Sequence, residues 1–195
     1  MPLIFRQGPA ATAFTVAVAA WLVFEFVMRI RQRRQAAGPT SADPTFLVLI
    51  ACLVAAVIAA EVLGREGRLP WPGGLAWPAV AGIAMITAGI GLRAWSITTL
   101  GRFFQYQITI QPSHQVVTSG PYRHLRHPAY TAIAFILVGI ALACDDVWSL
   151  AAAAALGGAG LAVRIRAEER QLTQALGADY QHFAVDRKRL MPGVW

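Results

Sequence analysis

The chain has 195 residues, of which 56% are hydrophobic and 14% are charged, and its formal net charge is +7 at pH 7. This length corresponds to about one domain, and the composition is too apolar for an ordinary soluble domain. A nucleic-acid-binding protein needs a solvated basic face, which most of this chain lacks, so no nucleic-acid partner is expected. We therefore expect a single all-α integral membrane domain spanning residues 1–195.

Five apolar runs are candidates for transmembrane helices, because about 20 helical residues cross the hydrocarbon core of a bilayer. In chain order they are residues 10–28, 45–63, about 75–95, 130–144 and 147–163. Gly82, Gly89 and Gly91 in the third run would let neighbouring helices approach closely. Only Asp145 and Asp146 separate the last two runs, which predicts a short antiparallel helical hairpin.

Arginines are concentrated after the first, third and fifth runs, whereas the other connections are acidic or balanced in charge. The positive-inside rule therefore predicts that the amino terminus lies outside and that the carboxyl-terminal tail lies in the cytosol. The first run could instead be a signal peptide, but it is longer than a usual signal-peptide core and an arginine cluster follows it. The preference for Arg over Lys and the abundance of Ala suggest a bacterial origin, so we expect the inner membrane.

The most polar stretch between apolar runs is HQVVTSGPYRHLRHPAY, residues 114–130. Its three histidines are irregularly spaced without nearby Cys, Asp or Glu, so no metal site is expected. No Ser or Cys stands in a nucleophile motif, and Gly120 alone does not make a phosphate-binding loop. One interpretation of the stretch is therefore a solvated loop that contacts lipid headgroups.

Three features favour a binding site instead. Pro128 occupies a preferred first-turn position of a helix, which places His127 beside the positive end of that helix. Arg164, Glu168 and Gln171 lie about one turn apart on one helical face just after the last apolar run. Both segments leave the membrane on the same predicted side, so one pocket could be lined by both.

These two segments resemble the isoprenylcysteine carboxyl methyltransferase family of integral-membrane enzymes, which use S-adenosylmethionine. The resemblance rests on the combination of Gly-x-Tyr and Arg-His-Pro-x-Tyr with the later RIRAEERQL, and it covers roughly residues 107–183. The three spans expected within residues 1–100 match the family only in their hydropathy. Residues 101–195 would be the catalytic half, with the hairpin, a carboxyl-terminal helix and a cytosolic cofactor pocket between the polar loop and that helix. Pro121 and Phe183 are modest departures from the family pattern.

The resemblance also implies roles for individual residues. The cofactor-binding positions would be Gln107, His114, Gln115, Val116, Val117, Tyr122, His127, Pro128, Ala129, Tyr130 and Glu168. Glu168 would contact the cofactor ammonium, and Arg164 would be the catalytic residue that orients the methyl acceptor. No metal is implied.

The expected activity is methyl transfer from S-adenosylmethionine to a lipid-like acceptor at the membrane interface, leaving S-adenosylhomocysteine as product. O-methylation of a carboxylate or a phenol is favoured, because Arg164 suits an anionic acceptor. A phospholipid N-methyltransferase and a membrane reductase of the sterol-reductase type remain alternatives, as does a non-enzymatic membrane scaffold. Membrane lipids and the lipophilic acceptor are the expected partners, and no obligate protein partner is inferred.

Overall fold

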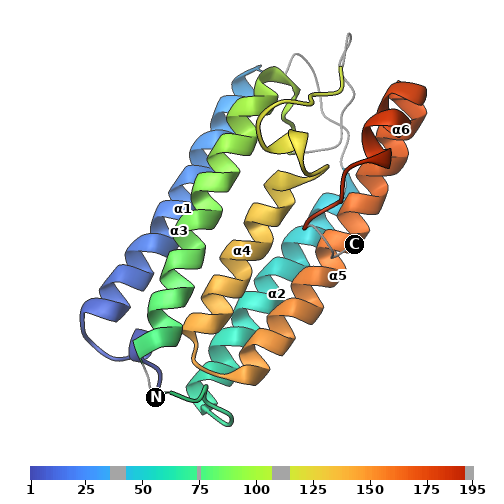
Figure 1. The fold of residues 1–195 in the computed structure, drawn as a ribbon. Helices are drawn as coiled ribbons and strands as arrows, with labels where there is room; N and C mark the ends of the chain where they lie inside the picture. Colours follow the sequence, from blue (N-terminus) through green and yellow to red (C-terminus); the bar gives the residue numbers. More distant parts are fainter. Residues whose placement is uncertain (36–42, 74–75, 107–114, 192–195) are drawn as a thin grey trace.

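The computed structural model describes residues 1–35, 43–73, 76–106 and 115–191, and these ranges form a bundle of helices (Figure 1). In chain order the elements are the 3₁₀ helix η1 (Leu3–Phe5), the helices α1 (Pro9–Gln35), α2 (Pro44–Glu66) and α3 (Ala76–Leu100), the 3₁₀ helices η2 (Gly101–Phe103) and η3 (Gly120–Arg123), and the helices α4 (Pro128–Ala143), α5 (Val147–Leu176) and α6 (Ala178–Val185). The described ranges contain no strand, only an isolated bridge between Leu125 and Lys188. The all-α prediction is confirmed.

Four of the described helices, α1, α2, α3 and α5, are long and apolar enough to cross a membrane. The helix α4 is apolar but has only 16 residues, so the five-span count stays a prediction. Exposed Leu22, Phe26, Val54 and Ile58 on α1 and α2 would be costly in water but suit a lipid environment. The protein is therefore an integral membrane protein.

The predicted hairpin is formed by α4 and α5, and α5 has 30 residues, so it contains both the apolar run 147–163 and the helical face that follows it. Residues 164–176 contain no Gly or Pro, so nothing interrupts the helix until Gly177, whose φ of 53° ends it. Arg164 and Glu168 therefore lie on the same continuous helix as the apolar residues of the hairpin. At the hairpin tip, Asp146 caps α5 by accepting a hydrogen bond from Ser149 N at 3.1 Å.

Close helix packing joins the amino-terminal helices to the hairpin of α4 and α5. The helix α3 packs along α4, and α2 packs along α5, while α1 lies against α3. A Cβ added at Gly82 would lie 2.5 Å from the carbonyl oxygen of Gly139, and one at Gly89 would lie 2.6 Å from Ile136 Cγ1. The predicted role of these two glycines is confirmed, whereas Gly91 has no such neighbour within 4 Å.

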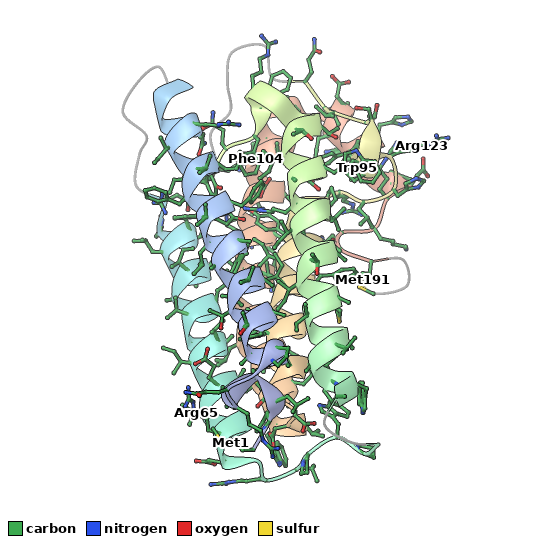
Figure 2. The ribbon with its side chains drawn as sticks, turned by 90° about the vertical axis from the view of Figure 1, so that its left-hand side faces the viewer. Met1, Arg65, Trp95, Phe104, Arg123 and Met191 are labelled. Carbon is green, nitrogen blue, oxygen red and sulfur yellow. The ribbon has the colours of Figure 1, made fainter. Side chains whose placement is uncertain are left out.

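The polar segments gather at one end of the bundle. In Figure 1 the carboxyl ends of α1, α3 and α5 lie at the same end as η3 and α6, and the α4–α5 turn lies at the other. Figure 2 likewise shows Trp95, Phe104 and Arg123 at the end opposite Met1 and Arg65. The polar loop and the end of α5 thus meet at one end of the bundle, and the membrane side of that end stays a prediction.

Candidate active site

A cavity of about 550 Å³ extends from the polar end of the bundle into its apolar interior. Its polar end is formed by residues 115–130, by the end of α5 and by α6. Its apolar part lies among α1, α2 and α4. One cavity is thus lined by polar residues at one end and by apolar residues at the other.

Most of the predicted cofactor-binding residues meet at this cavity. Those that line it are Gln115, Val116, Val117, Tyr122, His127, Ala129, Tyr130 and Glu168, and Arg164 lines it as well. Pro128 is buried at the first position of α4 but is not part of the lining. Gln107 and His114 lie outside the described residues, so their predicted role stays a prediction.

The carboxyl-terminal segment fixes the start of α4. Arg126 N and His127 N donate hydrogen bonds to the carbonyl oxygens of Lys188 and Arg189 at 2.8 and 3.0 Å. Glu169 lies beneath the loop, with its Oε1 3.2 Å from His127 Nε2 and 3.1 Å from Arg126 Nη1. These contacts hold the buried His127 ring beside the positive end of α4, as the sequence predicts.

Tyr130 connects the two segments identified in the sequence. Its hydroxyl donates a hydrogen bond to Glu168 Oε2 at 2.7 Å and accepts one from Arg164 Nε at 3.1 Å. The residue proposed for the cofactor and the residue proposed for the acceptor are therefore joined through one phenol.

Arg164 is 1% exposed and is surrounded by groups from three other segments. Its Nη1 donates to Thr45 Oγ1 at 2.9 Å and is paired with Asp43 Oδ2, both at the start of α2, and its Nη2 donates to the Tyr106 carbonyl at 2.6 Å. The guanidinium is thus enclosed within the protein and does not extend to the surface. Its charge already has an internal partner, which the sequence did not indicate.

A second ion pair at the cavity was also missed. Arg93 on α3 is 4% exposed, and its Nε donates to Glu25 Oε1 on α1 at 2.8 Å. The Tyr106 hydroxyl donates to Glu25 Oε2 at 2.8 Å. A signal was present in the sequence, because each of these charged residues interrupts an apolar run, and ionisable residues within spans usually mark functional sites.

Two phenols complete the polar end. Burial raises the pKa of Tyr122, and the negative charge of Glu168 raises it further, so this phenol stays protonated in the physiological range. Burial also raises the pKa of Tyr180, and the negative charges of Glu169 and Glu168 raise it further. The Tyr180 hydroxyl is buried at the cavity and has no hydrogen-bond partner within the described part of the chain. It is therefore able to donate a hydrogen bond to a ligand.

The apolar part of the cavity borders the lipid-exposed surface. Leu22 and Phe26 of α1 and Ile50, Val54 and Ile58 of α2 line the cavity and are all exposed. In a bilayer these side chains contact acyl chains, so this part of the cavity faces the hydrocarbon. Within the described ranges, no three His, Cys, Asp or Glu side chains lie together as a metal site would require.

The fold and the site define an integral membrane protein with a cavity that is polar at one end and lined by exposed apolar side chains of α1 and α2 at the other. Residues 82–174 match the model of the Isoprenylcysteine carboxyl methyltransferase (ICMT) family. The match contains most of the segment in which the sequence motifs lie, so the resemblance to this family is confirmed.

Individual proteins are similar to parts of this chain. Protein-S-isoprenylcysteine O-methyltransferase B of Arabidopsis thaliana is 34% identical over 121 residues, which cover 60% of this chain and 59% of that protein. A probable protein-S-isoprenylcysteine O-methyltransferase of Oryza sativa subsp. indica is 30% identical over 53% of this chain and 55% of its own length. The uncharacterized protein YpbQ of Bacillus subtilis is 28% identical over 48% of this chain and 56% of its own length. The matches thus span a little over half of each relative.

Proposed function

We propose that this protein is an S-adenosylmethionine-dependent methyltransferase that acts at the membrane interface on a lipid-like acceptor. The favoured reaction is O-methylation of a carboxylate or a phenol. The family match and the names of the plant relatives support methyl transfer. The observation that carries the proposal is the single cavity, which joins the polar residues around Glu168 to the lipid-exposed side chains of α1 and α2.

The residues at the polar end suit the chemistry of this cofactor. Glu168 supplies a carboxylate for its ammonium group, and the His127 end of α4 suits its carboxylate. The unpartnered Tyr180 hydroxyl, beside Phe183 and Leu176, suits a flat adenine with ring nitrogens that accept hydrogen bonds. When bound, the cofactor supplies a methyl group activated by the adjacent sulfonium.

The chain's own contribution is to orient both ligands and to exclude water. Transfer to an oxygen requires the acceptor oxygen, the methyl carbon and the sulfur to lie in line, so the rate depends on positioning. When an anionic oxygen meets a sulfonium, charge is neutralised in the transition state, and a dry site favours this change. Arg164 and Tyr130 lie where the polar and apolar parts of the cavity meet, and we assign them to holding the acceptor.

The proposed topology follows from the same arrangement. The cofactor would enter from the cytosol and the acceptor from the bilayer, which requires the polar end of the bundle to face the cytosol of a bacterial inner membrane. A reporter fused after residue 195 should then be cytosolic and one fused before Met1 should be outside. Reporters on the opposite sides at both ends would overturn this orientation.

The activity is tested by incubating purified protein with S-adenosylmethionine labelled in its methyl group and a lipid extract, followed by mass spectrometry of labelled lipids. We expect label in an O-methyl group of an amphipathic lipid. Label in a phospholipid amine would assign the protein to N-methylation instead. Absence of label together with absence of adenosylhomocysteine binding would refute the proposal.

A further inference from the structure

The start of α2 lies directly against the guanidinium group of Arg164. Arg164 Nη1 donates a hydrogen bond to Thr45 Oγ1 at 2.9 Å and is paired with Asp43 Oδ2. The Thr45 hydroxyl in turn donates to Asp43 Oδ1 at 2.7 Å. Each of the three side chains is therefore bonded to the other two.

The contacts of Asp43 and Thr45 divide between capping a helix and holding Arg164. Asp43 caps α2, since its Oδ1 accepts a hydrogen bond from Thr45 N at 2.9 Å. This cap uses one oxygen of Asp43 and the backbone of Thr45. The other carboxylate oxygen and the Thr45 hydroxyl contact Arg164, and a helix cap needs neither of these contacts.

Close packing of α2 against α5 holds this end of α2 in place. A Cβ added at Gly160 of α5 would lie 2.7 Å from Cys52 Cβ of α2, so the two helices nearly touch one turn before Arg164. Leu49 of α2 lies in one buried cluster with Ile165, the residue after Arg164. The packing of these two helices therefore sets the position of the start of α2 relative to Arg164.

Arg164 is also held by groups outside α2. Its Nε donates to the Tyr130 hydroxyl at 3.1 Å, and its Nη2 donates to the Tyr106 carbonyl at 2.6 Å. An arginine has five N–H donors, and its partners among the described residues occupy both hydrogens of Nη1, the hydrogen of Nε and one hydrogen of Nη2. The contacts at Nη1 thus help to fix the guanidinium plane, and with it the direction of the N–H that is left on Nη2.

We propose that Asp43 and Thr45 are positioning residues for methyl transfer, which act through Arg164. Arg164 lines the cavity, whereas neither Asp43 nor Thr45 does, so they act on the acceptor only through the guanidinium group. This inference rests on the proposed function, in which Arg164 holds the acceptor. Both residues lie outside the segment 82–174 that matches the family model, so the amino-terminal half of the chain completes the acceptor site.

The expected effect is on the rate of transfer. Transfer requires the acceptor oxygen, the methyl carbon and the sulfur to be aligned, so a small rotation of the group that holds the acceptor is enough to slow it. An arginine that loses one fixed partner keeps its charge but can turn toward other groups. Cofactor binding is assigned to Glu168 and to the His127 end of α4, and it should change little.

The first test removes the Thr45 hydroxyl. Thr45→Val nearly keeps the shape of the side chain and keeps the backbone N–H that completes the cap, whereas Thr45→Ser keeps the hydroxyl. The substrates are S-adenosylmethionine, labelled in its methyl group and saturating, and vesicles of a total bacterial lipid extract that contain 4-tetradecylbenzoate and 4-tetradecylphenol. The rate is expressed per adenosylhomocysteine-binding site, so unfolded protein does not contribute.

Thr45→Val should lower this rate about tenfold, with an affinity for adenosylhomocysteine within about twofold of the wild type. Thr45→Ser should restore most of the rate. A loss of rate at unchanged cofactor affinity, recovered by a hydroxyl, is not expected if Thr45 serves only the stability of α2.

Ser149→Ala provides the matched control. The Ser149 hydroxyl donates to the Ala60 carbonyl at 2.8 Å, so it also joins α5 to α2 through one buried hydrogen bond. This bond lies near the α4–α5 turn, at the end of the bundle opposite the polar segments (Figure 1). Thermal unfolding should show similar losses of stability in Ser149→Ala and Thr45→Val, and only Thr45→Val should lose transfer.

Asp43→Asn tests the other residue. Asn also caps helices well, but it lacks the charge that pairs with Arg164. The rate per binding site should fall more than in Thr45→Val, again with little change in cofactor affinity. If Asp43→Asn does not fold, the Thr45 comparison still decides.

A wild-type rate in Thr45→Val, or an equal loss of rate in Ser149→Ala, would overturn the inference and leave the proposed function intact. If the wild type labels no lipid in these vesicles, the inference fails together with the proposed acceptor chemistry. Adenosylhomocysteine binding, measured in the same protein, then shows whether the cofactor assignment survives.

Discussion

The hydroxyl of Tyr130 lies between Arg164 and Glu168, accepting from Arg164 Nε at 3.1 Å and donating to Glu168 Oε2 at 2.7 Å. It therefore couples the residue assigned to the acceptor with the residue assigned to the cofactor. A hydrogen bond to a charged group contributes about 1.5 to 3 kcal/mol. Tyr130→Phe should accordingly reduce methyl transfer by at least about tenfold and also weaken adenosylhomocysteine binding. Unchanged values of both quantities in a folded variant would show that this link has no functional role.

Glu168→Gln keeps the shape of the side chain and removes its charge. If Glu168 holds the cofactor ammonium, the loss of a charge-assisted hydrogen bond should weaken adenosylhomocysteine binding by about 1.5 to 3 kcal/mol. Calorimetry measures this change, and Glu61→Gln on α2 serves as a control, because Glu61 does not line the cavity. Equal affinities of the Glu168 variant and the wild type would refute the assignment.

Arg164 is buried, so its replacement should affect stability and activity more than replacement of a residue that only anchors the protein at the membrane interface. Arg164→Ala leaves Asp43 without this partner and should destabilise the protein by about 3 to 5 kcal/mol, besides reducing transfer at least tenfold. Arg164→Lys keeps the charge but lacks the planar group that reaches four partners, so it should restore activity only partly.

The double variant Arg164→Ala/Asp43→Asn provides the matched control, because it removes both charges. Thermal unfolding in detergent should show much of the stability recovered, while transfer stays low. Full activity in Arg164→Lys, together with little loss in Arg164→Ala, would instead assign Arg164 to membrane anchoring.

Site residues that lie in short sequence motifs could be predicted, whereas pairs between distant parts of the chain could not. His127, Arg164 and Glu168 fall within short polar motifs at the ends of apolar runs, so spacing and a shared membrane side brought them together, whereas Tyr130 was predicted only from the family resemblance. Glu25 and Asp43 form pairs with Arg93 and Arg164 across 68 and 121 residues, and helix packing alone creates these contacts. No local pattern encodes such pairs, although charged residues within apolar runs mark them as candidates.

For the fold, too, features determined by short stretches of sequence could be predicted, whereas contacts between distant segments could not. The apolar runs and the close-packing glycines Gly82 and Gly89 were predictable, because helix length and residue size determine them. The apolar run 147–163 and the helical face after it were predicted separately, and α5 joins them in one helix, because hydropathy falls at Arg164 while helix propensity does not. The enclosure of Arg164 by the start of α2 could not be foreseen, since the prediction treated that segment as a separate span.

The hairpin tip provides a test of pH-dependent stability that is independent of the cavity. Burial, together with the neighbouring Asp146, raises the pKa of Asp145, and its Oδ1 has no hydrogen-bond partner within the described residues. Because the folded state then holds this proton to higher pH than the unfolded state does, stability falls as pH rises from about 4 through the raised pKa.

Asp145→Asn should remove this loss, and Asn tolerates the positive φ of 53° at this position. The variant should be more stable than the wild type at neutral pH by up to about 1 kcal/mol, and the two should converge as the pH approaches 4. Melting curves in detergent across this range measure the difference. A difference that stays constant with pH would contradict titration of Asp145 as its cause.

The identity of the cofactor is the central claim, and a direct titration tests it. S-adenosylhomocysteine and NADPH are added separately to the purified full chain in detergent, and binding is followed by calorimetry. The account predicts saturable binding of S-adenosylhomocysteine at one site per chain and none of NADPH. Binding of NADPH without binding of S-adenosylhomocysteine would contradict the account and favour a membrane reductase.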